Sequence, residues 1–127
     1  MKLRLQSNSI RLRLKRGEVE QLAKTGRVEE TIIMGGGPDD AFQYALEASR
    51  AVSTPQAVLN KKGILVRVPV ETVSRWAAGD DVGMEAILPV GGQGRLQVLV
   101  EKDFACLNGT EEQNAGTFPN PLAGTKC

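Results

Sequence analysis

Residues 64–88 read ILVRVPVETVSRWAAGDDVGMEAIL, and this stretch decides the fold. Its first five residues are mostly β-branched, which favours a short strand. Pro69 opens an amphipathic helix whose apolar stripe contains Val73 and Trp76, and Gly79 ends it. Residues 82–88 then form a second predicted strand. The order of strand, helix, tight acidic turn and strand matters because the chain contains it twice.

The second occurrence is found by shifting the numbering by 54, which places residues 10–34 on residues 64–88 without a gap. The register extends outward on both sides. Identical pairs include Leu5/Leu59, Ile10/Ile64, Arg13/Arg67, Val19/Val73, Ala23/Ala77, Val28/Val82, Ile33/Ile87, Gln43/Gln97 and Glu47/Glu101. We interpret the pattern as an internal duplication of residues 2–49 and 56–103. The two repeats are expected to pack about an approximate twofold axis into a single compact domain spanning residues 1–103.

Each repeat is predicted to contain strand, strand, helix, strand and strand in that order. The predicted helices cover residues 17–24 and 69–79, and glycine-rich turns separate the last two strands of each half. The expected fold is therefore β-rich α+β, with eight short strands and two helices. Val19 and Val73 should occupy equivalent buried positions, and so should Leu22 and Trp76.

The composition limits the possible functions. The chain has 127 residues, 16 basic and 15 acidic side chains and no histidine. The missing histidine removes the commonest general base and the commonest metal ligand, so we expect no catalytic residues, no metal, no cofactor and no enzymatic activity. The start of the chain has no apolar segment typical of a secretory signal, and no apolar run is long enough to span a membrane. With only two cysteines, a cytoplasmic location is expected.

The strongest candidate for a binding site is a basic hairpin at the start of the chain. Residues 1–16 contain six basic side chains and no acidic one. Strand alternation places the basic residues outward on both predicted strands. We call the hairpin formed by residues 2–15 the basic ribbon; its cations are Lys2, Arg4, Arg11, Arg13 and Lys15. Such a ribbon suits a major groove and its phosphates, whereas the alternative is that the charges only solvate an exposed face or protect an edge strand.

The motifs in both halves resemble the AbrB/MazE-like swapped-hairpin domain. The run SNSIRLRL at residues 7–14 is similar to the MazE type, and residues 64–82 are similar to the AbrB type. The resemblance implies that hairpins are exchanged between the two copies, and that this chain is a monomeric, fused pseudo-dimer with double-stranded DNA as its partner. The contact zone that it implies consists of Arg4, Asn8, Ser9, Arg11 and Arg13, with Lys2, Lys15 and Arg67 as further candidates. The whole chain also resembles a small bacterial family with no assigned function, through the runs EKDFACL (101–107) and FPNP (118–121).

Two functions stay open. The first is a DNA-binding transcription regulator or antitoxin-like protein. The second is a protein-interaction or small-ligand module that has kept the fold without the DNA surface. The second repeat counts against DNA binding and favours charges that only solvate an exposed face or protect an edge strand. It replaces most of the basic positions with Gln56, Val58, Leu65 and Pro69 and keeps only Arg67 and the Lys61-Lys62 pair.

Residues 104–127 are predicted to be an irregular tail, rich in glycine, asparagine, proline and threonine. We expect it to dock through Phe104, Leu107, Phe118 and the segment 119–121. Cys106 and Cys127 are expected to be free thiols, with Cys106 the more buried, although a bridge between them is the chemical alternative.

Overall fold

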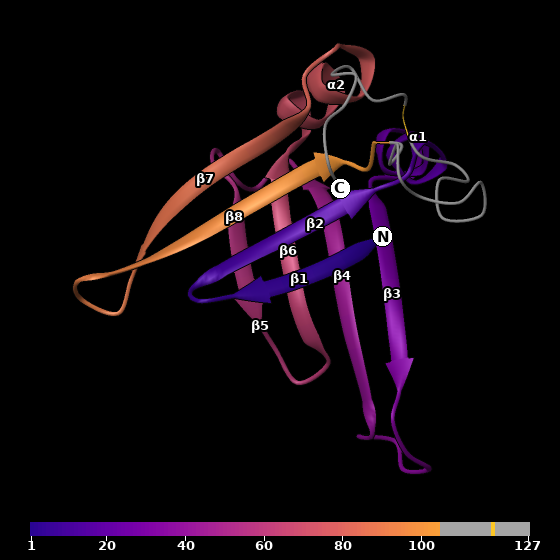
Figure 1. Ribbon diagram of the computed structural model, residues 1–127, viewed down its shortest axis with the longest axis vertical. Coiled ribbons are helices and arrows are strands. Elements are labelled where there is room, and N and C mark those ends of the chain that lie inside the picture. The colour runs from indigo at the N-terminus through magenta and orange to yellow at the C-terminus, as the bar shows by residue number, and fades with distance from the viewer. Residues whose placement is uncertain (105–117, 119–127) are drawn as a thin grey trace.

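The computed structural model describes residues 1–104 and 118. Their elements follow the predicted order and confirm the β-rich α+β class with eight strands and two helices (Figure 1). In chain order they are β1 (Lys2–Gln6), β2 (Ser9–Leu14), α1 (Arg16–Thr25), β3 (Arg27–Ile33), β4 (Ala41–Ser49), β5 (Gln56–Leu59), β6 (Gly63–Pro69), α2 (Val70–Ala78), β7 (Gly83–Val90) and β8 (Gly94–Lys102).

The strands form two four-stranded sheets, with the orders β1-β2-β8-β7 and β3-β4-β6-β5. Each sheet combines one hairpin from each repeat. The hairpins are joined at the centre of the sheet by a parallel pair, β2 with β8 and β4 with β6. Neither repeat builds a sheet by itself, because its two hairpins lie in different sheets. The hairpins are thus exchanged between the repeats within one chain.

The two parallel pairs have the same register. Ser9 lies opposite Gln97 in one sheet, and Gly63 lies opposite Gln43 in the other. Adding 54 to Ser9 and subtracting 54 from Gln97 converts the first pair into the second. The central strands therefore follow the approximate twofold relation that the sequence repeat predicts.

The edge strands β3 and β7 break this relation, and here the ungapped alignment is wrong. Val28 pairs with Leu46, so the shift of 54 predicts a pair between Val82 and Val100, but Met84 takes that place. The predicted equivalence of Ile33 and Ile87 fails in the same way. The connection from α2 to β7 is longer than the single residue between α1 and β3. A slip by two residues keeps the alternation of inward and outward side chains. Met84 therefore takes the buried place expected for Val82, which lies before β7 and is exposed.

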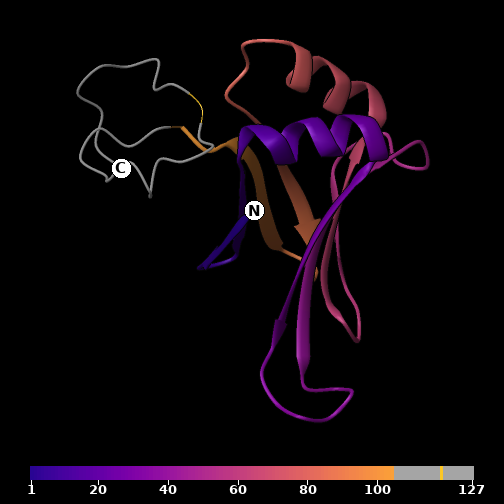
Figure 2. The same ribbon diagram turned by 90° about the vertical axis from the view of Figure 1, so that its right-hand side faces the viewer.

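The two helices lie together across one end of the sheets (Figure 2). Helix α1 ends at Gly26, which has the left-handed φ of 81° and donates its N–H to the carbonyl of Leu22. Val19 and Leu22 of α1 are buried, as are Val73 and Trp76 of α2, which confirms the predicted equivalences. No helix among the described residues is long and apolar enough to cross a membrane.

The core lies between the inner faces of the two sheets and under the helices. Both repeats contribute to it in nearly equal measure. Its buried members are Ile10, Leu12, Leu14, Val19, Leu22, Val28, Tyr44 and Leu46 from the first repeat, and Val66, Val68, Val73, Trp76, Met84, Val98 and Val100 from the second.

Phe118 is the one described residue beyond position 104, and it packs on the domain. Its N–H donates to the carbonyl of Asp103 at 2.7 Å, and its ring meets Phe104 edge-on at 5.9 Å. The ammonium group of Lys102 lies 5.5 Å from the Phe118 ring. Docking through Phe104 and Phe118 is thus confirmed. The predictions for Leu107, segment 119–121, Cys106 and Cys127 concern positions outside the described residues.

Candidate nucleic-acid interface

The basic ribbon is the antiparallel pair of β1 and β2. Lys2 lies directly opposite Arg13, and Arg4 lies directly opposite Arg11, so two like-charged pairs sit side by side. All four side chains alternate with inward residues such as Leu12, and they therefore lie on the outer face of the sheet β1-β2-β8-β7. Like charges opposite each other cost about 0.2–1 kcal/mol per pair. The fold tolerates this cost at two adjacent positions.

The turn between β1 and β2 is shaped by its polar side chains. Ser7 has a positive φ of 51°. The amide of Asn8 donates to the carbonyl of Arg95 at 2.6 Å, and the hydroxyl of Ser9 donates to the carbonyl of Gln6 at 2.6 Å. These bonds fix the tip of the ribbon against the start of β8. Asn8 and Ser9 thus shape the candidate surface, in keeping with the local turn chemistry of such residues.

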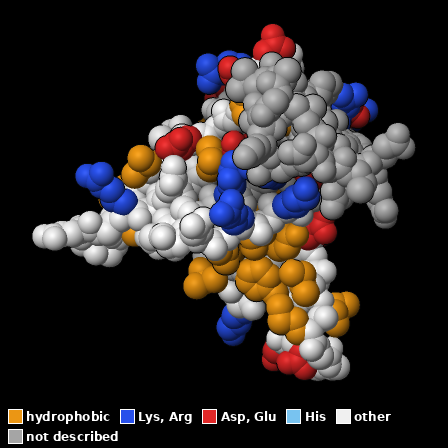
Figure 3. All heavy atoms as spheres, in the orientation of Figure 1, with side chains coloured by type: hydrophobic (Ala, Val, Ile, Leu, Met, Phe, Trp, Pro, Cys, Tyr) orange, Lys and Arg blue, Asp and Glu red, His pale blue; other side chains and the backbone are white. Residues whose placement is uncertain are grey.

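Two carboxylates from the other repeat partly compensate the charge of the ribbon. Glu101 on β8 forms ion pairs with Arg11 and, at 3.8 Å, with Arg13. The ammonium group of Lys2 lies 3.0 Å from the buried carboxylate of Asp103. Arg4 is exposed and forms none of the ion pairs found within residues 1–104. The side chain of Lys2 keeps 62% of its surface exposed and that of Arg13 keeps 37%, so the cations remain accessible from solvent (Figure 3).

The structure separates Arg67 from this surface and places Lys15 just beyond the end of β2. Arg67 on β6 belongs to the outer face of the other sheet, where its guanidinium pairs with Glu47 at 3.3 Å. Lys15 follows β2 as the residue that caps α1, and its backbone N–H donates to the carboxylate of Glu18 at 2.9 Å. Of the predicted site residues, the structure thus brings Lys2, Arg4, Arg11 and Arg13 together on paired strands, with the turn residues Asn8 and Ser9 at one end.

Sequence reasoning missed the contribution of β8 to the same face. A shallow hollow beside the ribbon, which we call the first hollow, is lined by Arg4, Gln6, Ser9, Ile10, Arg11, Gln97 and Leu99. A neighbouring hollow at the tip is lined in part by Arg95. The signal for Gln97 was present, because Gln43 and Gln97 are an identical pair of the repeat. This repeat pair could indicate a site residue only once it was known that β8 pairs with β2.

The donor groups around the first hollow suit an anion. Guanidinium groups form strong, charge-assisted hydrogen bonds with phosphate and carboxylate oxygens, and the side-chain amides of Gln6 and Gln97 can add neutral ones. The hydroxyl proton of Ser9 is already donated to the carbonyl of Gln6. Within the described part of the chain, no group of three or more histidine, cysteine, aspartate or glutamate side chains is placed to hold a metal ion. The donor groups of the first hollow can therefore hydrogen-bond an anionic group.

A family model matches residues 1–122, and the chain belongs to that family, which is described as a family of unknown function (DUF7009). This agrees with the resemblance of the whole chain to a family without an assigned function. No curated protein and no solved structure matches the chain.

Proposed function

We propose that this protein is a non-enzymatic module that binds double-stranded DNA through the outer face of the basic ribbon. One observation carries the proposal: Lys2, Arg4, Arg11 and Arg13 form a two-by-two array on paired strands, with their side chains directed away from the core. Glu101 and Asp103 compensate the charges of Arg11, Arg13 and Lys2 only in part, and Arg4 forms none of the ion pairs found within residues 1–104. A duplex supplies phosphates along both edges of its grooves, and a two-stranded ribbon fits the major groove.

The exchange of hairpins between the two repeats is a second observation that supports the proposal. The AbrB/MazE-like domains that the sequence resembles are built by exchange of hairpins between two copies, and their first hairpin contacts DNA. In this chain the exchange occurs between two repeats, so the first hairpin of repeat one is held by β8 of repeat two. We propose a role in transcription regulation or as an antitoxin-like protein, acting as a monomeric pseudo-dimer.

The test is a fluorescence titration of a labelled duplex with the full chain at a series of salt concentrations. If three to five phosphates are contacted, log-log plots of affinity against salt have slopes of about three to five, at roughly 0.9 per contact. The same titration with a single strand of equal length serves as the comparison. No binding to either at low salt would overturn the proposal.

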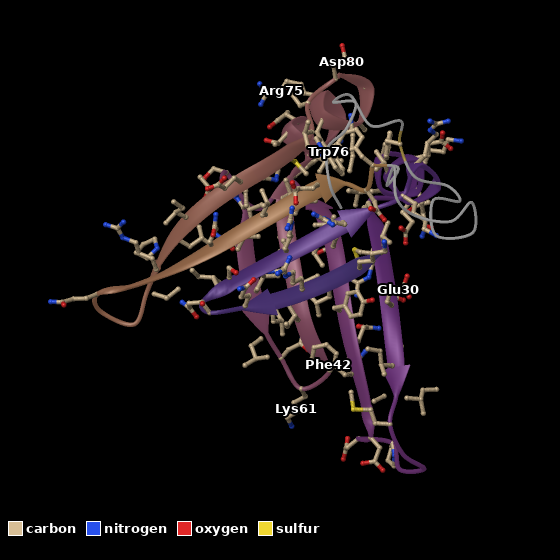
Figure 4. All side chains as sticks on the ribbon, viewed as in Figure 1. Glu30, Phe42, Lys61, Arg75, Trp76 and Asp80 are labelled. Carbon is tan, nitrogen blue, oxygen red and sulfur yellow. The ribbon has the colours of Figure 1, made fainter. Side chains whose placement is uncertain are left out.

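A second candidate function, a protein-interaction module, is favoured by exposed apolar side chains. Ile32 and Leu59 occupy core-facing positions of β3 and β5 but are exposed, because the sheet β3-β4-β6-β5 extends beyond the edge strand β1 (Figure 1). Leu5 on β1 and Met34, the residue after β3, are exposed as well. Figure 3 shows hydrophobic side chains gathered on this lower half of the molecule, and Figure 4 places the half-buried Phe42 among them. Contiguous exposed apolar surface of this kind marks interaction sites.

The occupant that the charges favour is a second copy of the chain. The acidic turn with Asp39 and Asp40 and the basic turn with Lys61 and Lys62 lie at the same end of this sheet. Two copies that meet through this end bring opposite charges within reach. Sedimentation velocity tests this function: a dimer that Leu59→Asp dissociates supports it. A monomer at all accessible concentrations excludes it.

A further inference from the structure

A second hollow lies on the outer face of the other sheet. It is lined by Arg27, Gln43, Ala45, Asn60, Lys61, Lys62, Ile64 and Leu65, so it contains three cations and two amides and no acidic side chain. Lys61 and Lys62 are exposed at the turn between β5 and β6, and Figure 4 labels Lys61 there. Sequence reasoning noted these two lysines only as a remnant of the basic stripe.

This second hollow is the counterpart of the first hollow under the twofold relation. The shift of 54 converts Gln97 into Gln43, Ile10 into Ile64 and Gln6 into Asn60. Both hollows lie where the tip of one first hairpin meets the start of the last strand of the other repeat. The positions of the charges differ, since Arg11 is replaced by Leu65 and the cations have moved to Lys61 and Lys62 on the turn.

The turn that carries the two lysines is firmly built. The side-chain carbonyl of Asn60 accepts hydrogen bonds from the backbone N–H groups of Lys62 and Gly63, at 2.8 and 3.0 Å. Gly63 has a φ of +147°, and a Cβ there would meet the carbonyl oxygen of Gln43 at 2.0 Å. Only glycine allows this close approach between the turn and β4. Lys61 and Lys62 are therefore presented from a fixed backbone.

Arg27, the third cation of the second hollow, already forms ion pairs with two carboxylates. Arg27 pairs with Glu29 at 3.1 Å and with Glu47 at 3.7 Å. Glu47 is the counterpart of Glu101, which holds Arg11 and Arg13 in the first repeat. Each outer face thus combines one glutamate that holds two arginines with further cations that line the hollow, Arg4 on one face and Lys61 with Lys62 on the other.

The geometry points to a second phosphate-binding site at this hollow, which makes the chain a bridge between two segments of duplex DNA. The two sheets pack through their inner faces, so their outer faces point in opposite directions and one straight segment cannot occupy both sites. The inference rests on the proposed function and extends it to a second contact. The second site has fewer cations held on strands and is the weaker of the two.

The experiment is a capture assay with the full chain. A biotinylated duplex is immobilised, the protein is added at low salt, and a fluorescent duplex of unrelated sequence is supplied. Intact protein is expected to retain the fluorescent duplex. The double variant Lys61→Ala/Lys62→Ala is expected to bind the immobilised duplex with unchanged affinity but to retain fluorescence only at the level seen without protein. The matched control is Lys24→Ala, which removes an exposed lysine of α1 that lines neither hollow.

The outcomes separate the two proposals. Binding of one duplex without retention of the second overturns the bridge and leaves the proposed function intact. Retention that persists in the double variant also overturns the second site, because another surface must then hold the duplex. Failure to bind any duplex overturns the proposed function and the bridge together. Loss of retention in the double variant establishes the second site if retention is kept in Lys24→Ala and the double variant sediments as the intact protein does. A loss of retention that accompanies dissociation of a dimer overturns the second site.

Discussion

The basic ribbon β1–β2 and its counterpart β5–β6 have the same strand register and the same relation to the core, but they differ on their outer faces. Inward positions conserve their character between the two, as in Ile10 and Ile64 or Leu12 and Val66. The outward counterparts are Lys2 and Gln56, Arg4 and Val58, Arg11 and Leu65, and Arg13 and Arg67. The second ribbon forms with one strand cation in four. The cations of the first ribbon are therefore not needed to build the hairpin, which supports a role in binding.

Substitutions in the core are expected to have the largest effects on the free energy of unfolding, and these effects should be similar in the two repeats. Leu22 and Trp76 are counterparts and are almost fully buried. Leu22→Ala is expected to lower the free energy of unfolding by about 2–5 kcal/mol and Trp76→Ala by about 3–5 kcal/mol. Denaturant unfolding followed by circular dichroism measures both. Each variant should show one transition, because the hairpins are exchanged; two separate transitions would mean that the repeats fold independently.

One pair of counterpart positions in the two ribbons differs in backbone strain. Gly63 and Ser9 are counterparts, but only Gly63 has a left-handed φ and lies against the carbonyl of Gln43. Gly63→Ser is expected to destabilise the protein by at least about 1–3 kcal/mol, whereas Ser9→Gly should cost about 0.5–1 kcal/mol. Thermal unfolding of the two variants provides the measurement. Equal losses would contradict the assigned difference between the turns.

The glutamates of the two outer faces offer a sharper comparison. Glu101→Gln frees Arg11 and Arg13, so the affinity for the first duplex and the salt slope should both rise, the slope by about one. Glu47→Gln should leave both unchanged, because Arg67 lies on the other face. Each change should cost no more than about 1 kcal/mol of stability, since these ion pairs are partly exposed. A loss of affinity in Glu101→Gln would mean that Glu101 itself helps to contact the partner.

The smallest effect concerns the sole tyrosine. Burial, then the nearby Glu30 and Glu18, raise the pKa of Tyr44 above its usual value of 10.0, and its hydroxyl donates to the carbonyl of Met1. The folded state prefers the neutral phenol, so its contribution to stability is present below pH 10 and is lost as the pH rises through the raised pKa. An absorbance titration of the phenolate should give a midpoint above 10 that falls in Glu30→Gln. A midpoint that this substitution leaves in place would remove Glu30 as a cause.

The sequence predicts the elements and the pseudo-twofold relation well, because apolar periodicity and the repeat constrain the same positions. Val19, Leu22, Val73 and Trp76 could be placed in the core from spacing alone. The slip that puts Met84 in place of the expected Val82 could not be predicted. A two-residue slip keeps the alternation of β7 intact, so both registers fit the apolar pattern equally well.

The candidate site could be predicted only in part, for a related reason. The outward side chains of β1 and β2 follow from alternation within one hairpin. Gln97 and Glu101 reach the same face through the parallel pair of β2 and β8, which joins residues almost 90 positions apart in the chain. The pairs Arg13/Arg67 and Glu47/Glu101, which are identical in the two repeats, reflect this strand pairing, because each arginine contacts the glutamate of the other repeat.

The salt dependence of duplex binding tests most directly whether the first ribbon is the contact surface. The comparison is between the double variant Arg4→Ala/Arg11→Ala and Arg67→Ala, with folding of both verified by Trp76 fluorescence. We expect the double variant to lower the log-log slope by about two and to weaken binding, since two phosphate contacts are lost at roughly 0.9 each. Arg67→Ala, at the position equivalent to Arg13 on the opposite face, should bind the first duplex as the intact protein does. Equal losses in the two variants, or an unchanged slope in the double variant, would contradict the claim.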